Sequence, residues 1–139
     1  MFNQRSILIT GGTGSFGQAY TKILLKRYQP KRIVIFSRDE QKQAEMQQNF
    51  TDKCIEFRIG DVRDPQSLQQ AMADIDFVIH AAAMKHVPAA EHNPMECIKT
   101  NIHGSENVIH AAIEAQVEKV MLLSLIKQPI QLIYTAPPN

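Results

Sequence analysis

The residues best suited to chemistry form a glycine-rich loop near the start of the chain. Four of the six glycines lie between Thr10 and Gly17, after a short apolar run and at the start of an expected helix. Gly11, Gly14 and Gly17 give the spacing G-x-x-G-x-x-G, and Gly12 also completes G-x-G-x-x-G. In this context glycines permit a tight turn, close approach of the backbone to a pyrophosphate, and helix–strand packing. The loop predicts a dinucleotide site at a helix N-terminus, which attracts anions; the alternative is a plain flexible turn.

The residues after the second apolar run decide which nicotinamide cofactor fits. An acidic residue there would bind the ribose 2′-hydroxyl of NAD, whereas Ser37 and Arg38 offer a hydroxyl and a guanidinium suited to a 2′-phosphate. Lys42 lies about one helical turn further along. This pattern predicts NADP as the cofactor. The alternative is that Arg38 pairs with Asp39 or Glu40 on a solvated surface.

Further candidates follow the third and fourth apolar runs. Asp61 and Val62 are placed to bracket an adenine, with Asp61 toward its amino group. Ala81 and Ala82 are small enough for the backbone to lie against the cofactor, although their small size could equally serve tight core packing. Lys85 comes next, at the edge where ligands of open α/β sheets bind, and could bridge cofactor and substrate.

The histidines and cysteines do not predict a metal site. His80, His86 and His92 are evenly spaced, but they span a strand end, a loop and a helix start, and they lack a carboxylate or cysteine partner at zinc-site spacing. Cys54 and Cys97 each lie in an apolar segment. We expect them to pack as small hydrophobic residues, as in a reducing compartment, and not to form a disulfide.

Short apolar runs and helical patterns alternate along the chain and must position these residues. The expected strands cover residues 6–10, 31–36, 54–59, 76–80 and 119–124, and the expected helices cover 15–28, 40–50, 65–73 and 94–115. Runs that are apolar on both faces are typical of strands buried on both sides. The order predicts an α/β fold with a doubly wound parallel sheet, a Rossmann fold, that is truncated after the fifth strand.

The last expected helix has the clearest start. Asn93 can cap it and Pro94 suits its first position. Gly104 would allow close approach to a neighbour. The apolar face expected to pack into the core consists of Ile98, Ile102, Ile109 and Ile113.

Composition limits the class of protein. The chain has 139 residues, which is enough for one domain, because domains typically need roughly 100–150 residues. A net charge of +1 and 21% charged residues argue against a nucleic-acid-binding surface and against disorder. No apolar run approaches the roughly 18–20 residues of a membrane span, and the start does not resemble a signal peptide. We therefore expect a cytoplasmic protein with a small-molecule partner.

Together these segments resemble the inverting UDP-N-acetylglucosamine 4,6-dehydratases of the extended short-chain dehydrogenase/reductase superfamily, which feed bacterial polysaccharide or flagellin sugars. The resemblance extends from Met1 to about Ser124 and is carried by ILITGGTGSFG, IFSRDEQKQ, IGDVRD, VIHAAAMKHVPAAEHNPMECIKTNIHGSENVI and VMLLS. It implies an NADP that is consumed and regenerated within one turnover. The sugar is oxidised at C4, loses water across C5 and C6, and regains the hydride at C6 with inversion at C5.

The resemblance also implies roles for particular residues. Lys85 would lie near both cofactor and substrate, and Thr100 and Asn101 match a segment that lines the nicotinamide side of the site. Asn101 could equally be a buried polar group that bends its helix. The implied cofactor contacts fall on Thr13, Ser15, Phe16, Ser37, Arg38, Lys42, Asp61, Val62, Ala81 and Lys85.

Residues 125–139 depart from the family where its catalytic segment should be. The family continues with an Asp and a Lys for proton transfer and a Tyr and a Lys for the hydride step. Here Ile126 stands at the Asp position, Tyr134 comes one residue early, and Pro138 replaces the second Lys. Deleting one nucleotide from suitable codons for the family segment yields LIKQPIQLIYTAPPN and then a stop. We therefore interpret the tail as frameshifted, with Lys127 a vestige of the family's catalytic lysine.

This interpretation divides the chain into an NADP-binding Rossmann half-domain, 1–124, and an aberrant tail, 125–139. It predicts no dehydratase turnover, weak or absent binding of UDP-N-acetylglucosamine, and reduced affinity for NADP. An open sheet edge predicts a homo-oligomer or aggregation, and the alternating stretch Ile130 to Thr135 could add a strand to such an edge. The alternative is a non-catalytic NADP-binding sensor or interaction module on the same fold.

Overall fold

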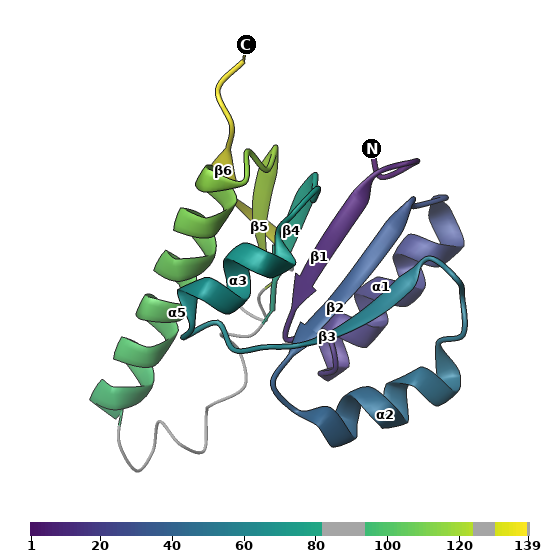
Figure 1. The fold of residues 1–139 in the computed structure, drawn as a ribbon, viewed down its shortest axis with the longest axis horizontal. Helices are drawn as coiled ribbons and strands as arrows, with labels where there is room; N and C mark the ends of the chain where they lie inside the picture. Colours follow the sequence, from purple (N-terminus) through teal and green to yellow (C-terminus); the bar gives the residue numbers. More distant parts are fainter. Residues whose placement is uncertain (82–93, 124–129, 139) are drawn as a thin grey trace.

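The computed structural model describes residues 1–81, 94–123 and 130–138. Within them, six strands form one sheet in the order β3-β2-β1-β4-β5-β6 (Figure 1). The strands are β1 (Ser6–Thr10), β2 (Arg32–Ser37), β3 (Ile55–Ile59), β4 (Phe77–His80), β5 (Lys119–Leu123) and β6 (Ile130–Thr135). The helices are α1 (Ser15–Arg27), α2 (Glu40–Asn49), α3 (Pro65–Ala71) and α5 (Pro94–Glu114).

The first five strands form the predicted doubly wound sheet. β1 pairs in parallel with both β2 and β4, so the chain changes direction across the sheet between β1 and β4. β3 and β5 extend the two halves, also in parallel. In an open α/β sheet of this kind, ligands bind outside the carboxyl ends of the strands at the point where the strand order reverses. The Rossmann fold predicted from the alternation of elements is thus confirmed.

The parallel part of the sheet ends at the fifth strand, as predicted, and a sixth, antiparallel strand follows it. Residues 130–135 form β6, antiparallel to β5, with Leu123 opposite Ile130 and Lys119 opposite Thr135. An irregularity of register lies between Val120 and Met121. The alternating apolar pattern of this stretch suits an edge strand, and the expectation that it could add a strand is confirmed.

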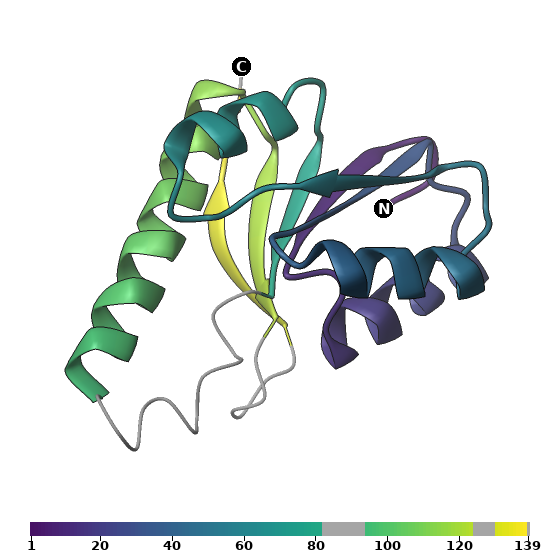
Figure 2. The ribbon, with the colours of Figure 1, turned by 60° about the horizontal axis from the view of Figure 1, so that its bottom comes forward.

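Helices cover both faces of the sheet (Figure 2), and the side chains of each strand alternate between them. Ile7, Ile9 and Ile35 belong to the core cluster that also contains Leu24 of α1 and Met46 of α2. The residues between them point the other way, toward α3 and α5. This double-sided burial explains why the central strands β1, β2 and β4 are predominantly apolar on both faces.

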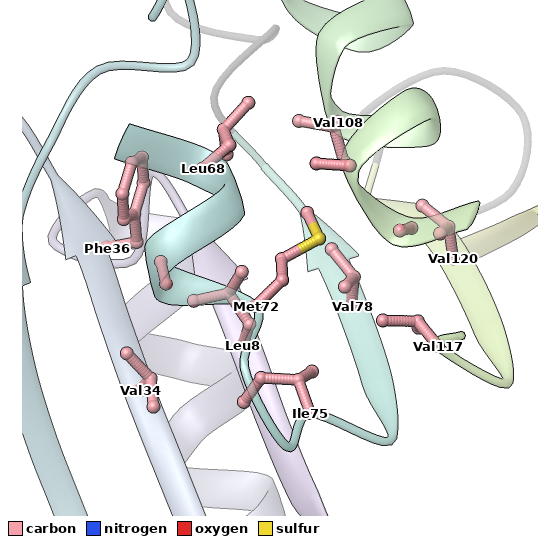
Figure 3. Packing of buried hydrophobic residues seen from close by; sticks show 13 residues of the cluster. Leu8, Val34, Phe36, Leu68, Met72, Ile75, Val78, Val108, Val117 and Val120 are labelled. Carbon is pink, nitrogen blue, oxygen red and sulfur yellow. The ribbon is translucent and has the colours of Figure 1, made fainter. Parts of the chain in front are cut away.

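The second core cluster joins the two halves of the sheet (Figure 3). Leu68 and Met72 from the region of α3 lie beside Phe36 and Val78, and Val108 reaches in from α5. Ile133 and Tyr134 of β6 pack against the same cluster. The tail therefore shares the hydrophobic core of the parallel sheet.

The buried face of α5 differs from the predicted one. Gly104, Val108 and Ala112 are buried, whereas Ile113 is 48% exposed and Ile109 is only partly buried. The side chains of Ile98 and Ile102 lie outside the described residues. The face that carries the isoleucines was the wrong prediction, because α5 approaches its neighbours so closely that small residues form the contact. A Cβ on Gly104 would lie 3.0 Å from Val62 Cγ2. Close approach at Gly104 is thereby confirmed.

Among the described residues, no helix combines the length and the apolar character that a membrane span requires.

Candidate functional site

The glycine-rich loop follows β1 at the carboxyl edge of the sheet. Gly11 has a φ of 64°, a left-handed conformation that glycine adopts without a Cβ penalty. Its N–H donates to Phe36 O of β2 at 2.8 Å, and Gly14 N donates back to Gly11 O at 3.2 Å. These bonds fold the loop across the end of β2 and deliver the chain to the start of α1.

Two glycines of this loop are required by close packing. A Cβ on Gly17 would lie 2.5 Å from Gly12 Cα, and a Cβ on Gly12 would lie 2.8 Å from Ile35 Cγ2. Neither distance is possible without movement of the backbone or the core. The first turn of α1 thus rests directly on the loop backbone, as a short strand-to-helix connection beneath a phosphate requires.

The N-terminus of α1 presents unpaired backbone donors. Gly14 is its N-cap, and among the described residues no side chain caps this end. The first bond of the helix runs from Gln18 N to Gly14 O at 3.0 Å. The N–H groups of Ser15, Phe16 and Gly17 precede that bond and have no partner within the helix. This end of α1 can therefore receive an anion.

Thr13 adds an unsatisfied hydroxyl to the loop. The residue is 4% exposed, and its Oγ1 has no hydrogen-bond partner in the described part of the chain. Its carbonyl oxygen, by contrast, accepts from Gln18 Nε2 at 2.8 Å. A buried hydroxyl without a partner costs about 1–3 kcal/mol, which an additional acceptor would relieve. The loop thus fits the pyrophosphate of a dinucleotide in both shape and donor groups.

The hydroxyl of Ser37 is oriented by Gln43, a residue that the sequence reasoning missed. The amide nitrogen Nε2 of Gln43 lies 2.9 Å from Ser37 Oγ, 3.2 Å from Ser37 O and 2.9 Å from Arg58 O. Because carbonyl oxygens only accept, the amide group that faces them must be the donor. Ser37 Oγ therefore accepts from Gln43, and its own hydrogen is available to a further acceptor. One feature of the sequence could have indicated that Gln43 is buried: it lies three residues before Met46 and therefore on the same, buried face of α2.

Arg38 and Lys42 are exposed beside Ser37. Asp39 is occupied in capping α2, since its Oδ1 accepts from Lys42 N at 3.0 Å. In the described ranges Arg38 forms no ion pair with Asp39 or Glu40, so the structure gives no support to the alternative interpretation of Arg38. A hydroxyl donor and two cationic side chains thus lie at the end of β2, which is the donor set that a phosphate monoester needs.

At the end of β3, Asp61 is held by Arg63. The carboxylate accepts from Arg63 N at 2.9 Å, from Nε at 3.1 Å to each oxygen, and from Nη2 at 2.7 Å. The hydrogen-bonded Arg63 guanidinium holds the pKa of the Asp61 carboxyl below its usual value, and Arg38 contributes in the same direction. Asp61 is therefore ionised at neutral pH. Arg63 is a second residue that sequence reasoning missed.

Val62 connects this strand end to α5. Its carbonyl oxygen accepts from Asn107 Nδ2 at 3.0 Å, and its side chain packs against the second core cluster. The side of Val62 next to Gly104 is filled by the close approach of α5. The turn from Gly60 to Asp64 is thus fixed to the helix that carries Thr100 and Asn101.

The end of β4 is closed by a buried histidine. His80 Nδ1 lies 2.6 Å from Thr10 Oγ1, and its Nε2 lies 3.2 Å from Ser105 Oγ of α5. Burial lowers the pKa of His80 to about 4, so the ring is neutral. Ala81, also buried, donates its N–H to Thr10 O at 3.0 Å. Ala81 therefore lies directly beside the end of β1.

The structure brings most of the predicted residues to one edge of the sheet. The glycine loop, Ser37 with Arg38, Asp61 with Val62, and Ala81 follow four adjacent strands. Thr100 and Asn101 fall within α5, where the structure describes the helix and not their side chains. Ala82, Lys85 and Lys127 lie outside the described residues, as does Asn93.

Tyr134 lies at the opposite edge. It pairs with Val120 of β5, one residue after the start of that strand, and is partly buried against the second core cluster. The antiparallel direction of β6 carries the chain away from the carboxyl edge, and Ala136 N donates to Glu118 O at 2.8 Å. Tyr134 therefore does not approach the glycine loop.

Comparison with known proteins gives one family and a set of longer relatives. The polysaccharide biosynthesis protein family matches residues 7–131. The UDP-N-acetylglucosamine 4,6-dehydratase (inverting) of Campylobacter jejuni subsp. jejuni is 64% identical over 124 residues, which are 89% of this chain and 37% of the relative. The UDP-glucose 4-epimerase of Rickettsia bellii is 51% identical over 127 residues, with the same two coverages.

Solved structures give the same fold. Pen from Bacillus thuringiensis is 44% identical with a TM-score of 0.81, covering 88% of this chain and 37% of that chain. The UDP-glucose-4-epimerase of Stenotrophomonas maltophila, solved with bound NAD and formylated UDP-arabinopyranose, is 25% identical with a TM-score of 0.70, covering 85% of this chain and 36% of that one. The chain thus spans little more than a third of the length of the proteins it matches.

Proposed function

The chain belongs to the polysaccharide biosynthesis protein family, and we propose that it is the NADP-binding part of a nucleotide-sugar dehydratase. The observation that carries this proposal is the donor set at the end of β2. Gln43 makes Ser37 Oγ an acceptor, so that the Ser37 hydroxyl can donate toward a phosphate that Arg38 would also bind. The free 2′-hydroxyl of NAD would be bound better by an acidic residue than by the Ser37 hydroxyl or the Arg38 guanidinium.

A nicotinamide dinucleotide is supported by the loop and by a relative. The left-handed Gly11, the close packing of Gly12 on Gly17, and the unpaired Thr13 hydroxyl together form a cradle for a pyrophosphate. The structure of the Stenotrophomonas epimerase contains NAD. The 2′-phosphate distinguishes NADP from NAD, and the residues at Ser37 and Arg38 favour NADP.

The nicotinamide, when bound, supplies a hydride acceptor and donor. The residues of this chain would hold it from four strand ends. The N–H groups of the loop and the Thr13 hydroxyl would bind the pyrophosphate. The 2′-phosphate would be bound by Ser37, Arg38 and Lys42. The adenine would lie between Asp61 and Val62. Ala81 would lie against the cofactor with its backbone, and Lys85, Thr100 and Asn101 would continue the site toward the nicotinamide and the sugar.

For the longer protein that this chain resembles, we propose UDP-N-acetylglucosamine 4,6-dehydration and not epimerisation. The proposal is supported by the identity to the Campylobacter dehydratase, 64%, against 51% to the Rickettsia epimerase. We propose that this chain itself does not turn over. The position of Tyr134 at the amino end of β5 supports this, because a hydride-step tyrosine must approach the nicotinamide. We also propose that UDP-N-acetylglucosamine binding is weak or absent.

A second candidate function is a non-catalytic NADP-binding module. It is favoured by β6, which pairs along β5 and places Ile133 and Tyr134 against the core, so that the tail is an ordered strand of the same sheet. The two candidate functions predict different gene sequences downstream of the codons for this chain. Codons for a sugar-binding domain in another reading frame downstream would support a frameshifted dehydratase, and their absence would support a dedicated module.

Cofactor titration tests the proposed function. We expect tighter binding of NADP than of NAD by calorimetry, and a higher Tm with NADP. Arg38→Ala should weaken NADP about tenfold, equivalent to ~1.4 kcal/mol, and leave NAD unchanged. Arg27→Ala is the matched control, because Arg27 is exposed in the last turn of α1. Equal affinities for the two cofactors, or no binding of either, would contradict the proposal.

A further inference from the structure

Arg63 binds both oxygens of the Asp61 carboxylate. Its N, Nε and Nη2 groups make four contacts with them, and the single Nε hydrogen is shared between the two oxygens. A carboxylate offers about four lone-pair sites, two on each oxygen. The bidentate fork also fixes the orientation of the group. Arg63 thus occupies most of the hydrogen-bonding capacity of Asp61 within the turn that follows β3 and leaves room for a contact with the adenine.

The pairing matters because Asp61 has a second cationic neighbour. Arg38, at the end of the adjacent strand β2, is close enough to favour the ionised form of Asp61. With Arg63 present, two guanidinium groups share the one carboxylate of Asp61. Without Arg63, Arg38 would be left as the guanidinium partner of Asp61, which would then compete with a phosphate for it.

We propose that Arg63 is a positioning residue for cofactor specificity: by pairing with Asp61 it keeps Arg38 available for the 2′-phosphate. This inference rests on the proposed function, because it assumes that Arg38 binds a 2′-phosphate. Arg63 acts through Asp61 and need not touch the cofactor. The affinity for NAD, which carries no 2′-phosphate, would depend on Arg63 less than the affinity for NADP does.

The side chain of Arg63 contributes little to the fold itself. It is 58% exposed and packs into neither core cluster. The start of α3 does not depend on it either, because Asp64 is the N-cap there and its Oδ1 accepts from Gln66 N at 3.1 Å. Removal of the Arg63 side chain should therefore leave the fold intact, which makes a binding measurement interpretable.

The experiment is a double-mutant cycle read out as the ratio of NADP to NAD affinity. Wild type, Arg63→Ala, Asp61→Asn and the double variant are each titrated with both cofactors, with Arg27→Ala as the control for removal of one exposed arginine. We expect Arg63→Ala to weaken NADP about fivefold and NAD less than about twofold. In the Asp61→Asn background, the same change should leave the ratio unaltered, because the competing carboxylate is gone.

The possible outcomes separate this inference from the proposed function. If wild type shows no preference for NADP, the proposed function is wrong and the inference falls with it. If wild type prefers NADP and Arg63→Ala keeps the ratio, or weakens both cofactors equally, only the role of Arg63 is overturned. A loss that persists in the Asp61→Asn background would mean that Arg63 contacts the phosphate directly, which also overturns a role through Asp61.

Discussion

Gln43 donates its buried amide to the hydroxyl of Ser37 across 2.9 Å, and the same nitrogen also reaches main-chain carbonyls of Ser37 and Arg58. One side chain of α2 therefore joins the ends of β2 and β3 and determines which way the Ser37 hydroxyl points. Because Gln43 is 4% exposed, these bonds form away from competing water.

Gln43→Glu should reduce both stability and the preference for NADP. A carboxylate would accept the Ser37 hydrogen, face two carbonyl oxygens without a donor, and repel a 2′-phosphate. We expect a loss of about 1–3 kcal/mol in the free energy of unfolding and a lower NADP-to-NAD affinity ratio. Gln47→Glu, exposed on the same helix, is the control of equal charge. Urea denaturation and cofactor titration measure the two effects, and an unchanged ratio would show that Gln43 does not orient Ser37.

Gly17→Ala should damage the loop without altering its charge. The added Cβ would lie 2.5 Å from the backbone of Gly12, so the first turn of α1 must move away from the loop. We expect about 1–3 kcal/mol of destabilisation and a Tm lower by about 5–10 °C, with weaker binding of both cofactors. Gly14→Ala is the comparison for stability, since Gly14 has a φ of −75° that alanine tolerates. Equal Tm values for the two variants would contradict the packing argument.

His80 should make the protein less stable in mild acid. Its pKa is about 6.5 when unfolded and about 4 when buried in the folded protein, so the unfolded state alone takes up a proton between these values. Stability should therefore be complete above about pH 6.5 and fall by up to roughly 3 kcal/mol as the pH drops toward 4. Denaturant unfolding at pH 7 and pH 4.5 measures this change.

The loss of stability between pH 7 and pH 4.5 should disappear in His80→Asn. It should remain in His110→Asn, which replaces an exposed histidine of α5. If His80→Asn still lost this stability in acid, the pH dependence would come from other titratable groups.

The outer edge of β6 should support the predicted homo-oligomer. β6 is the last strand of the sheet, and Leu132 on it is 57% exposed. An exposed apolar edge strand favours pairing with another chain, and a charge on it opposes such pairing. Leu132→Lys should weaken self-association at least about fivefold by sedimentation, whereas Ile113→Lys on α5 should change it little. The reverse pattern would assign the contact to α5.

The apolar runs were sufficient to predict the strands and helices, whose bounds differ from the expected ones by at most two residues. Strong signals explain this: Pro65 follows the capping Asp64, and the central strands β1, β2 and β4 are buried on both faces. The residues of the glycine loop and those after β2, β3 and β4 could likewise be assigned to one edge, because parallel strands end together.

The relationships between side chains could not be predicted. Gln43 and Arg63 are polar residues whose roles depend on distances across the fold, and no spacing rule connects Gln43 with Arg58 O. The face of α5 was misjudged because Gly104 and Ala112 pack more closely than the larger isoleucines do. The direction of β6 depends on pairing with β5, which its alternation alone does not encode.

The direction of β6 also determines where a label or tether can be attached without covering the glycine loop. Since β6 runs antiparallel to β5, the chain leaves the sheet beside Glu118, and both chain ends lie at the end of the molecule away from the arrowheads of the parallel strands such as β1 (Figure 1). A fluorescent reporter or a surface tether attached at either end would therefore stand behind the glycine loop and leave its approach open. An immobilised protein should then bind nucleotides as it does when free.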